Sequence, residues 1–164
     1  PGRGATMELR ALETGDLEAA RAIWNAIIRD TNITFTDIER TPESMADWLV
    51  SGGPRLGAFE GGRLLGFASA SQFRPGPGYR YTFEHSVHLA PEARGKGAGR
   101  ALMEALYAAL RPYGAHSLIG AITGDNHVSL AFHARLGFVE VGRMAEAGWK
   151  FGQWHELVLV EKRL

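Results

Sequence analysis

Apolar residues recur at the spacing of one helix face in four parts of the chain. These stripes run from Leu17 to Ile28, from Met45 to Leu49, from Leu102 to Leu110 and from Leu130 to Leu136. The flanking residues that favour helix ends are Thr14 or Asp16, Thr41 followed by Pro42, Asn126, and Gly137. The pattern therefore predicts four helices.

Stretches rich in β-favouring residues predict strands around these helices. They cover residues 8–12, 55–60, 63–73, 79–89, 117–122, 138–143 and 155–161. The Gly61-Gly62 pair separates the second stretch from the third and predicts a hairpin turn. Strands mixed with helices predict a layered α/β fold, in a single domain over residues 7–164. Residues 1–6 are expected to be a disordered tail or a tag remnant, and they lack the apolar core of a signal peptide.

Composition and charge narrow the classes of function. Of 164 residues, 18 are Lys or Arg and 18 are Asp or Glu, so no global field favours nucleic acid or an anionic membrane. No apolar run approaches the ~20 residues of a membrane-spanning helix. Because there is no Cys, a disulfide scaffold, a Cys-based zinc site and a thiolate nucleophile are excluded. A reducing, cytoplasmic location is the expectation.

A glycine-rich basic loop lies between a predicted strand and the helix after it. It reads Arg94-Gly95-Lys96-Gly97-Ala98-Gly99-Arg100. Glycines allow backbone N–H groups to approach an anion closely, and a helix start offers unpaired donors. The loop therefore predicts a site for a phosphate-bearing ligand, the alternative being a helix start that needs glycine only to turn. A Walker A loop is excluded because no Lys-Ser or Lys-Thr occurs, and the dinucleotide fingerprint fails because Arg100 replaces its third glycine.

The remaining spacing, Arg94-x-x-Gly97-x-Gly99, resembles the diphosphate loop of the GNAT superfamily of acetyl-CoA-dependent N-acetyltransferases. The segments Val87-x-Leu89 and Leu136-Gly137-Phe138 are similar too, and the resemblance covers Glu8 to the C-terminus. Two further segments, residues 81–87 and 148–154, resemble the phosphinothricin and methionine sulfoximine acetyltransferase branch. The resemblance implies the GNAT fold, in which helices flank a central mixed, mostly antiparallel sheet. It also implies acetyl-CoA as co-substrate and a homodimer, with the stretch from Trp149 to Trp154 as a loop at the dimer contact.

The resemblance implies roles for single residues. The Val87 N–H would polarise the thioester carbonyl, Glu84 would act as general base, and His133 or a water would protonate the leaving thiolate. The residues implied in acetyl-CoA binding are Val87, His88, Leu89, Arg94, Gly95, Lys96, Gly97, Ala98, Gly99, Arg100 and Asn126. Each side chain has a plainer alternative: Glu84 as a strand residue paired with Arg80, His133 as a packing residue, and Asn126 as a helix cap.

The acceptor site is less defined by the sequence. An amino-acid acceptor needs a cation for its carboxylate, and Arg gives the better geometry. The candidate substrate residues are Phe35, Phe73, Arg74, Arg80, Glu84 and His85. No metal site is expected, because His85 and His88 are three apart on a strand and face opposite ways.

These observations predict an N-acetyltransferase that moves the acetyl group of acetyl-CoA to the primary amine of a small molecule. An amino-acid analogue such as methionine sulfoximine, methionine sulfone or phosphinothricin is the leading acceptor, through the branch resemblance. The alternatives are a protein N-terminus or lysine as acceptor, and a sensor that binds acyl-CoA without catalysis.

Overall fold

The computed structural model of the chain describes residues 6–164, so residues 1–5 of the expected tail lie outside it. The strands are β1 (Met7–Ala11), β2 (Arg55–Glu60), β3 (Arg63–Gln72), β4 (Thr82–Leu89), β5 (Ser117–Thr123), β6 (Val139–Lys150) and β7 (Gln153–Arg163). The α-helices are α1 (Leu17–Asp30), α2 (Pro42–Val50), α3 (Ala98–Leu110) and α4 (His127–Arg135). No helix in residues 6–164 is long and apolar enough to cross a membrane.

The strands form a seven-stranded sheet in the order β1-β2-β3-β4-β5-β7-β6. Neighbouring strands are antiparallel except β4 and β5, which pair in parallel. Because a parallel pair needs a crossover, the chain passes through α3 between these two strands. The predicted mixed, mostly antiparallel sheet flanked by helices is confirmed.

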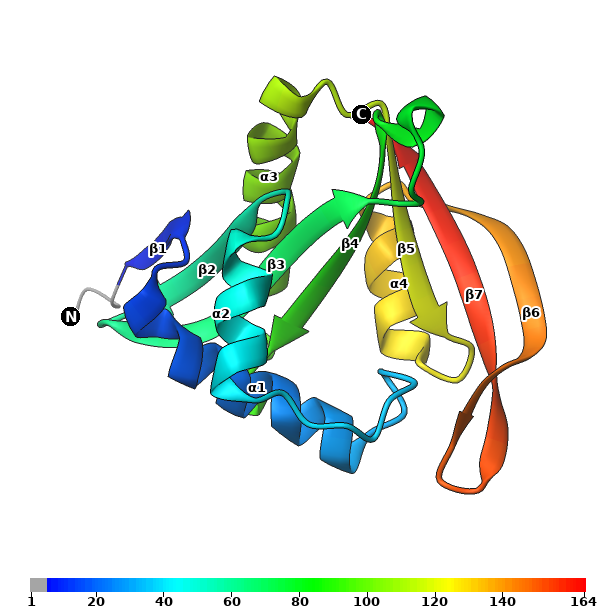
Figure 1. Ribbon diagram of the computed structural model, residues 1–164, viewed down its shortest axis with the longest axis horizontal. Helices are drawn as coiled ribbons and strands as arrows, with labels where there is room; N and C mark the ends of the chain where they lie inside the picture. Colours follow the sequence, from blue (N-terminus) through cyan, green and yellow to red (C-terminus); the bar gives the residue numbers. More distant parts are fainter. Residues whose placement is uncertain (1–5) are drawn as a thin grey trace.

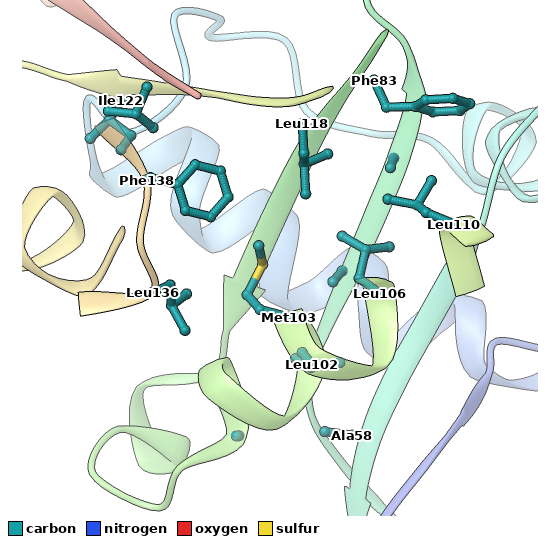
Figure 2. Close-up of a cluster of buried hydrophobic side chains, with 14 of the residues drawn as sticks. Ala58, Phe83, Leu102, Met103, Leu106, Leu110, Leu118, Ile122, Leu136 and Phe138 are labelled. Atoms are coloured by element: carbon teal, nitrogen blue, oxygen red, sulfur yellow. The ribbon is translucent and has the colours of Figure 1, made fainter. Parts of the chain in front are cut away.

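Two apolar clusters lie against the sheet, whose arrangement with the helices Figure 1 shows. The larger one is built around α3, where Leu102, Met103, Leu106 and Leu110 are fully buried and face Leu118 of β5 (Figure 2). The smaller cluster joins α1 and α2 to β2 and β3. The larger cluster also contains Phe83 of β4 and Leu118 and Ile122 of β5, so packing against α3 positions these two strands.

Local sequence signals explain several element boundaries. The Thr41 side chain accepts a hydrogen bond from Ser44 N–H, and Pro42 occupies the first turn of α2. Gly61 and Gly62 have φ of +58° and +80°, as the turn of a two-residue hairpin requires. These predictions are confirmed.

Three strand predictions are wrong at their boundaries. The strand expected from residue 79 begins at Thr82, because Pro77–Tyr79 forms a 3₁₀ turn. The strands expected at 138–143 and 155–161 are longer than predicted, and together they form a hairpin. Trp149 and Trp154 pair across this hairpin, although a loop was expected from Trp149 to Trp154. Bulges interrupt the register of β6 between Glu140 and Gly142 and between Met144 and Gly148, so the alternation that marks a strand is lost there.

Candidate active site

The parallel ladder between β4 and β5 ends half-way along both strands. It consists of the pairs Thr82↔Ser117, Phe83↔Leu118 and Glu84↔Ile119. Beyond Glu84 and Ile119 the two strands continue without pairing, and Figure 1 shows them moving apart. An opening in the middle of the sheet follows, which we call the β4–β5 splay.

Unpaired backbone groups of β4 line the splay. The Ala90 N–H donates to Leu65 O at 2.8 Å and the Phe73 N–H donates to Thr82 O at 2.9 Å. The register of β3 and β4 is unbroken between these two bonds. The even-numbered residues of β4 therefore direct their N–H and C=O groups towards β3. The odd-numbered residues therefore direct their N–H and C=O groups towards β5, where Val87 and Leu89 have no ladder partner within the described part of the chain.

The edge of β5 presents unpaired groups in the same way. The Gly124 N–H donates to Glu156 O and the Leu164 N–H to His116 O, both at 2.9 Å. Even-numbered residues of β5 are therefore paired with β7. Ala121 and Thr123 direct their backbone groups into the splay instead. An extended ligand with amide groups would find hydrogen-bond partners on both sides.

The start of α3 carries free donors beside the splay. Gly95 and Gly97 have φ of +77° and +78°, a region in which only glycine is unstrained. Among residues 6–164 no side chain caps the helix start at Gly97, and no acidic residue lies in the first turn. The first N–H groups of α3 therefore have neither an intrahelical partner nor a side-chain acceptor, which makes this end of the helix suited to an anion.

Three exposed cations flank this helix start. Lys96 pairs with Glu60 of β2 at 3.4 Å, and Arg100 pairs with Glu104 one turn later at 3.2 Å. Arg94 forms no ion pair within residues 6–164. Exposed pairs of this kind contribute little to stability, so all three cations remain available to an anion.

A cavity of about 170 Å³ occupies the splay and reaches both faces of the sheet. Its walls come from β4 (His85–His88), β5 (Gly120–Thr123), α1 and the segment after it (Trp24, Ile33, Thr34), and the start of α4 (Asn126, Ser129, His133). The Asn126 Oδ1 accepts from Ser129 N–H at 3.2 Å, so the predicted cap is present. Its side-chain amide remains at the cavity wall.

His85 and His133 form a buried pair at this wall. Their Nε2 atoms lie 3.0 Å apart, and the Nδ1 of His133 lies 2.8 Å from Ser129 O. A carbonyl can only accept, so His133 carries its proton on Nδ1 and its Nε2 accepts from His85. Burial and the neighbouring His133 lower the pKa of His85 to about 3, and burial lowers the pKa of His133. Both rings are neutral, and Gly120 leaves room for them, since a Cβ there would lie 3.0 Å from His85.

The opposite face of β4 carries Glu84, Ser86 and His88. Glu84 is half-buried and forms no ion pair or side-chain hydrogen bond within residues 6–164, and burial raises the pKa of its carboxyl. His88 packs between Trp24 and Phe67, and burial lowers its pKa to about 4. His88 thus faces away from His85, as the sequence predicted, and its side chain belongs to the α1–α2 side of the cavity.

The remaining candidate substrate residues lie in separate places. Arg74 and Arg80 border a more open hollow of about 560 Å³ at the far end of β3 and β4. Phe73 packs on Tyr79 at that same end. Phe35 lies instead against His155, with ring centroids 6.0 Å apart. Of the six candidates only His85 lines the cavity. Glu84 lies where the β4–β5 ladder ends, next to the cavity wall but not part of it, and the other four lie elsewhere.

A sequence model of the Acetyltransferase (GNAT) family matches residues 20–138. The chain belongs to the GNAT family of acetyltransferases. The phosphinothricin N-acetyltransferase of Alcaligenes faecalis is 37% identical over 162 residues, which cover 95% of this chain and 82% of the relative. The L-methionine sulfoximine/L-methionine sulfone acetyltransferase of Pseudomonas paraeruginosa is 35% identical over 164 residues, covering 95% and 94%.

A solved GNAT structure agrees in fold and in co-substrate. The protein yncA from Salmonella typhimurium, whose structure was solved with its cofactor acetyl-CoA, superposes with a TM-score of 0.93 at 31% identity. The match covers 97% of this chain and 94% of that one. The predicted family, acetyltransferase activity and use of acetyl-CoA are therefore confirmed.

The chemistry of the splay fits acetyl-CoA. The free helix start and its cations suit a diphosphate, and the unpaired edges of Val87 and Leu89 suit an arm that contains amides. Within residues 6–164 no group of three or more His, Asp or Glu side chains is arranged to hold a metal ion.

Sequence reasoning missed three contributors to the site. Ser129 lies at helical spacing from both Asn126 and His133, so that spacing could have indicated it. The edge formed by Ala121 and Thr123 depends on backbone pairing, which leaves no side-chain signal. Lys150 contacts the segment after α1 across more than 110 residues of sequence, and no local pattern reports such a contact.

Proposed function

We propose that the chain acetylates the primary amine of a free amino-acid analogue of the methionine sulfoximine, methionine sulfone or phosphinothricin kind. The observation that carries this proposal is the position of Glu84, a half-buried, unpaired carboxylate where β4 and β5 part. An amine acceptor has to lose a proton before it attacks a thioester, and such a carboxylate can accept it. The names of the two curated relatives support the acceptor class.

Acetyl-CoA supplies the activated acetyl group when bound. The N–H groups from Gly95 to Arg100 are proposed to hold its diphosphate, with Arg94, Lys96 and Arg100 adding positive charge. Val87 and Leu89 are proposed to pair with its amide-bearing arm as a neighbouring strand would. His88 would contribute through its backbone only, because its ring packs in the aromatic cluster.

Glu84 and Val87 are proposed to divide the chemistry, with the Glu84 carboxylate acting from one face of β4 and the Val87 N–H from its open edge. Glu84 accepts the proton of the acceptor ammonium, directly or through water. The Val87 N–H donates to the thioester oxygen as the amine attacks, and one such donor lowers a barrier by roughly 2.7–4 kcal/mol. Because the chain has no Cys, the amine attacks the thioester directly, without an acetyl-cysteine intermediate.

The leaving thiolate also needs a proton. Both ring nitrogens of His133 are engaged, Nδ1 with Ser129 O and Nε2 with His85. Proton donation by His133 would break one of these bonds, and because burial lowers its pKa the ring stays neutral and has no imidazolium proton to donate. This arrangement supports water as the donor, with His133 and Asn126 shaping the wall beside the sulfur.

Arg74 and Arg80 remain candidates for the acceptor carboxylate. Neither forms an ion pair with any residue from 6 to 164, and both border the hollow at the far end of β3 and β4. Ser71, which is paired with Glu84, also lines that hollow and connects it with the base. His85 lines the separate cavity in the splay, and Phe73 packs on Tyr79 without lining either hollow.

We further propose a cytoplasmic homodimer. The exposed side chains of Trp149, Phe151 and Trp154 at the hairpin end support an apolar contact surface. Light scattering of the purified chain should give twice the monomer mass, and a monomer at all concentrations would overturn this proposal.

The test of function is an acetyl-transfer assay over a panel of amines. Thiol release can be followed with a disulfide reagent without background, because the protein has no Cys. We expect turnover of methionine sulfoximine, methionine sulfone or phosphinothricin at least tenfold above an alanine-ended peptide and a lysine peptide. Turnover of peptides alone would indicate a protein acetyltransferase, and coenzyme A binding without any turnover would indicate a sensor.

A further inference from the structure

Lys150 is a buried lysine without a carboxylate partner in residues 6–164. It lies at the end of β6 and is 4% exposed. Its Nζ donates to Ile28 O and Thr31 O at 2.7 Å and to Thr34 O at 2.8 Å. Burial lowers the pKa of Lys150, and the charge of Asp37 opposes this. Three carbonyls satisfy the three N–H groups of the ammonium, and the first of them belongs to the last turn of α1, where positive charge is favoured.

The carbonyls that Lys150 binds belong to the segment that forms one side of the cavity. Thr31 and Thr34 lie on either side of Ile33, and both Ile33 and Thr34 line the cavity. These residues reach the cavity from the α1–α2 side of the sheet, the side on which Glu84 lies. Without the ammonium, three main-chain carbonyls would lose their shared donor, and a buried acceptor without a partner is unfavourable.

His155 holds the same segment from the facing strand β7. Its Nε2 lies 2.9 Å from Lys150 O and therefore donates, which leaves Nδ1 to accept from the Asn32 side-chain amide at 3.2 Å. Asn32 O in turn accepts from the Thr123 hydroxyl of β5 at 2.8 Å. The segment is thus bonded to both strands beside the turn of the β6–β7 hairpin and to the edge of the splay.

Packing adds to these bonds. The Phe35 ring stacks on His155 with an interplanar angle of 23°. A Cβ at position 148 would lie 2.2 Å from Phe35, so the glycine there allows the ring to touch the backbone of β6. Three contacts made beside the hairpin turn, at Gly148, Lys150 and His155, therefore all fall on the segment from Thr31 to Phe35.

We infer that Lys150 and His155 are positioning residues, which fix the segment from Thr31 to Phe35 as the acceptor-side wall of the active site. The inference rests on the proposed function, because it assigns this wall to the amine acceptor. Neither side chain touches the splay edge of β4 or the start of α3. Acceptor binding should therefore depend on Lys150 and His155, whereas coenzyme A binding should not.

The test compares Lys150→Met, which keeps the length of the side chain without its donors, with Lys162→Met as a matched control. Lys162 also donates to a main-chain carbonyl, Leu136 O, but lies away from this wall. In Lys150→Met we expect the KM for the acceptor amine to rise tenfold or more, with the coenzyme A dissociation constant within twofold of the unmodified chain. The control should leave both quantities within twofold.

Hydrogen exchange gives a readout that does not need turnover. Amides of residues 31–36 should exchange at least tenfold faster in Lys150→Met, while those of β4 keep their rates. Should Lys150→Met fail to fold, His155→Phe serves instead, since it keeps the ring on Phe35 and loses both hydrogen bonds. It should give the same KM shift and faster exchange around Asn32.

Failure of this inference can be told from failure of the proposed function. If the unmodified chain turns over no amine, the proposed function fails, whatever the exchange data show. If it does turn over an amine, an unchanged acceptor KM or unchanged exchange at 31–36 in the folded variants overturns the positioning role. An equal loss of coenzyme A affinity would also overturn it, because the effect would then be general.

Discussion

Replacing Glu84 with Gln should separate catalysis from stability. The side chain is half-buried and has no ion pair or side-chain hydrogen bond within residues 6–164, so Gln removes the charge without leaving a buried partner unpaired. Loss of a general base lowers kcat/KM by roughly 10²–10⁴, which corresponds to about 2.7–5.4 kcal/mol. Coenzyme A affinity should stay within twofold, because Val87 and the start of α3 are untouched.

Stability should change in the opposite direction. Burial raises the pKa of Glu84 above its ordinary value of 4.5, so its ionised form is less favourable in the folded chain than in the unfolded chain. Such a group contributes most to the free energy of unfolding at a pH below its pKa in the unfolded chain. This contribution is lost as the pH rises through its pKa in the folded chain. At neutral pH the ionised Glu84 therefore destabilises the folded chain. Glu84→Gln should melt at the same temperature as the unmodified chain or at a higher one.

Two measurements are needed: the rate of thiol release as a function of pH, and the melting temperature. Glu43→Gln serves as the control, because Glu43 is an exposed carboxylate on α2. The unmodified chain should show an acid limb in kcat/KM that lies above the usual range of a carboxylate, and Glu84→Gln should lack it. Activity within tenfold of the unmodified chain, or the same acid limb in the variant, would refute the role of Glu84. A lower melting temperature with low activity would indicate a structural role instead.

Three further predictions concern the anion site and the core. Gly97→Ala places a Cβ at a residue with φ of +78°. The free energy of unfolding in urea should fall by about 1–2 kcal/mol, and coenzyme A should bind more weakly. Unchanged coenzyme A affinity would show that Gly97 is not part of the site. Asn126→Asp keeps the cap on α4 but loses the amide donor, so calorimetry should show weaker coenzyme A binding. It should not show the ~1 kcal/mol loss of stability that is expected for Asn126→Ala. If Asn126→Asp binds coenzyme A with unchanged affinity, Asn126 acts as a helix cap only. Met103→Ala empties a fully buried position and should destabilise the chain by about 2–5 kcal/mol, and a loss below ~1 kcal/mol would contradict the packing around α3.

Patterns within one element predicted much of the fold. The stripe from Leu102 to Leu110 places α3, because burial of one helix face leaves a local period. Gly61-Gly62 and Asn126 mark a turn and a cap whose geometry depends on a few neighbouring residues. The Arg-x-x-Gly-x-Gly loop belongs to the same class of signal, since its conformation follows from its own glycines.

Features that depend on contacts distant in sequence were not predicted. The length of β6 was missed because its bulges and exposed position break the alternation of buried residues. The gap beyond Glu84 and Ile119 depends on how two strands diverge, which their sequences do not report. The separation of Phe35 from Arg74, like the bonds of Lys150, follows from tertiary packing.

The central claim is that backbone donors at the start of α3 hold the diphosphate of acetyl-CoA. Calorimetric titration of the unmodified chain with coenzyme A and with pantetheine, which lacks the diphosphate, tests it most directly. Coenzyme A should bind at one site per chain, more weakly as salt is added, and at least a hundredfold more tightly than pantetheine. Equal affinity for the two, or no association with coenzyme A at millimolar concentration, would contradict the claim.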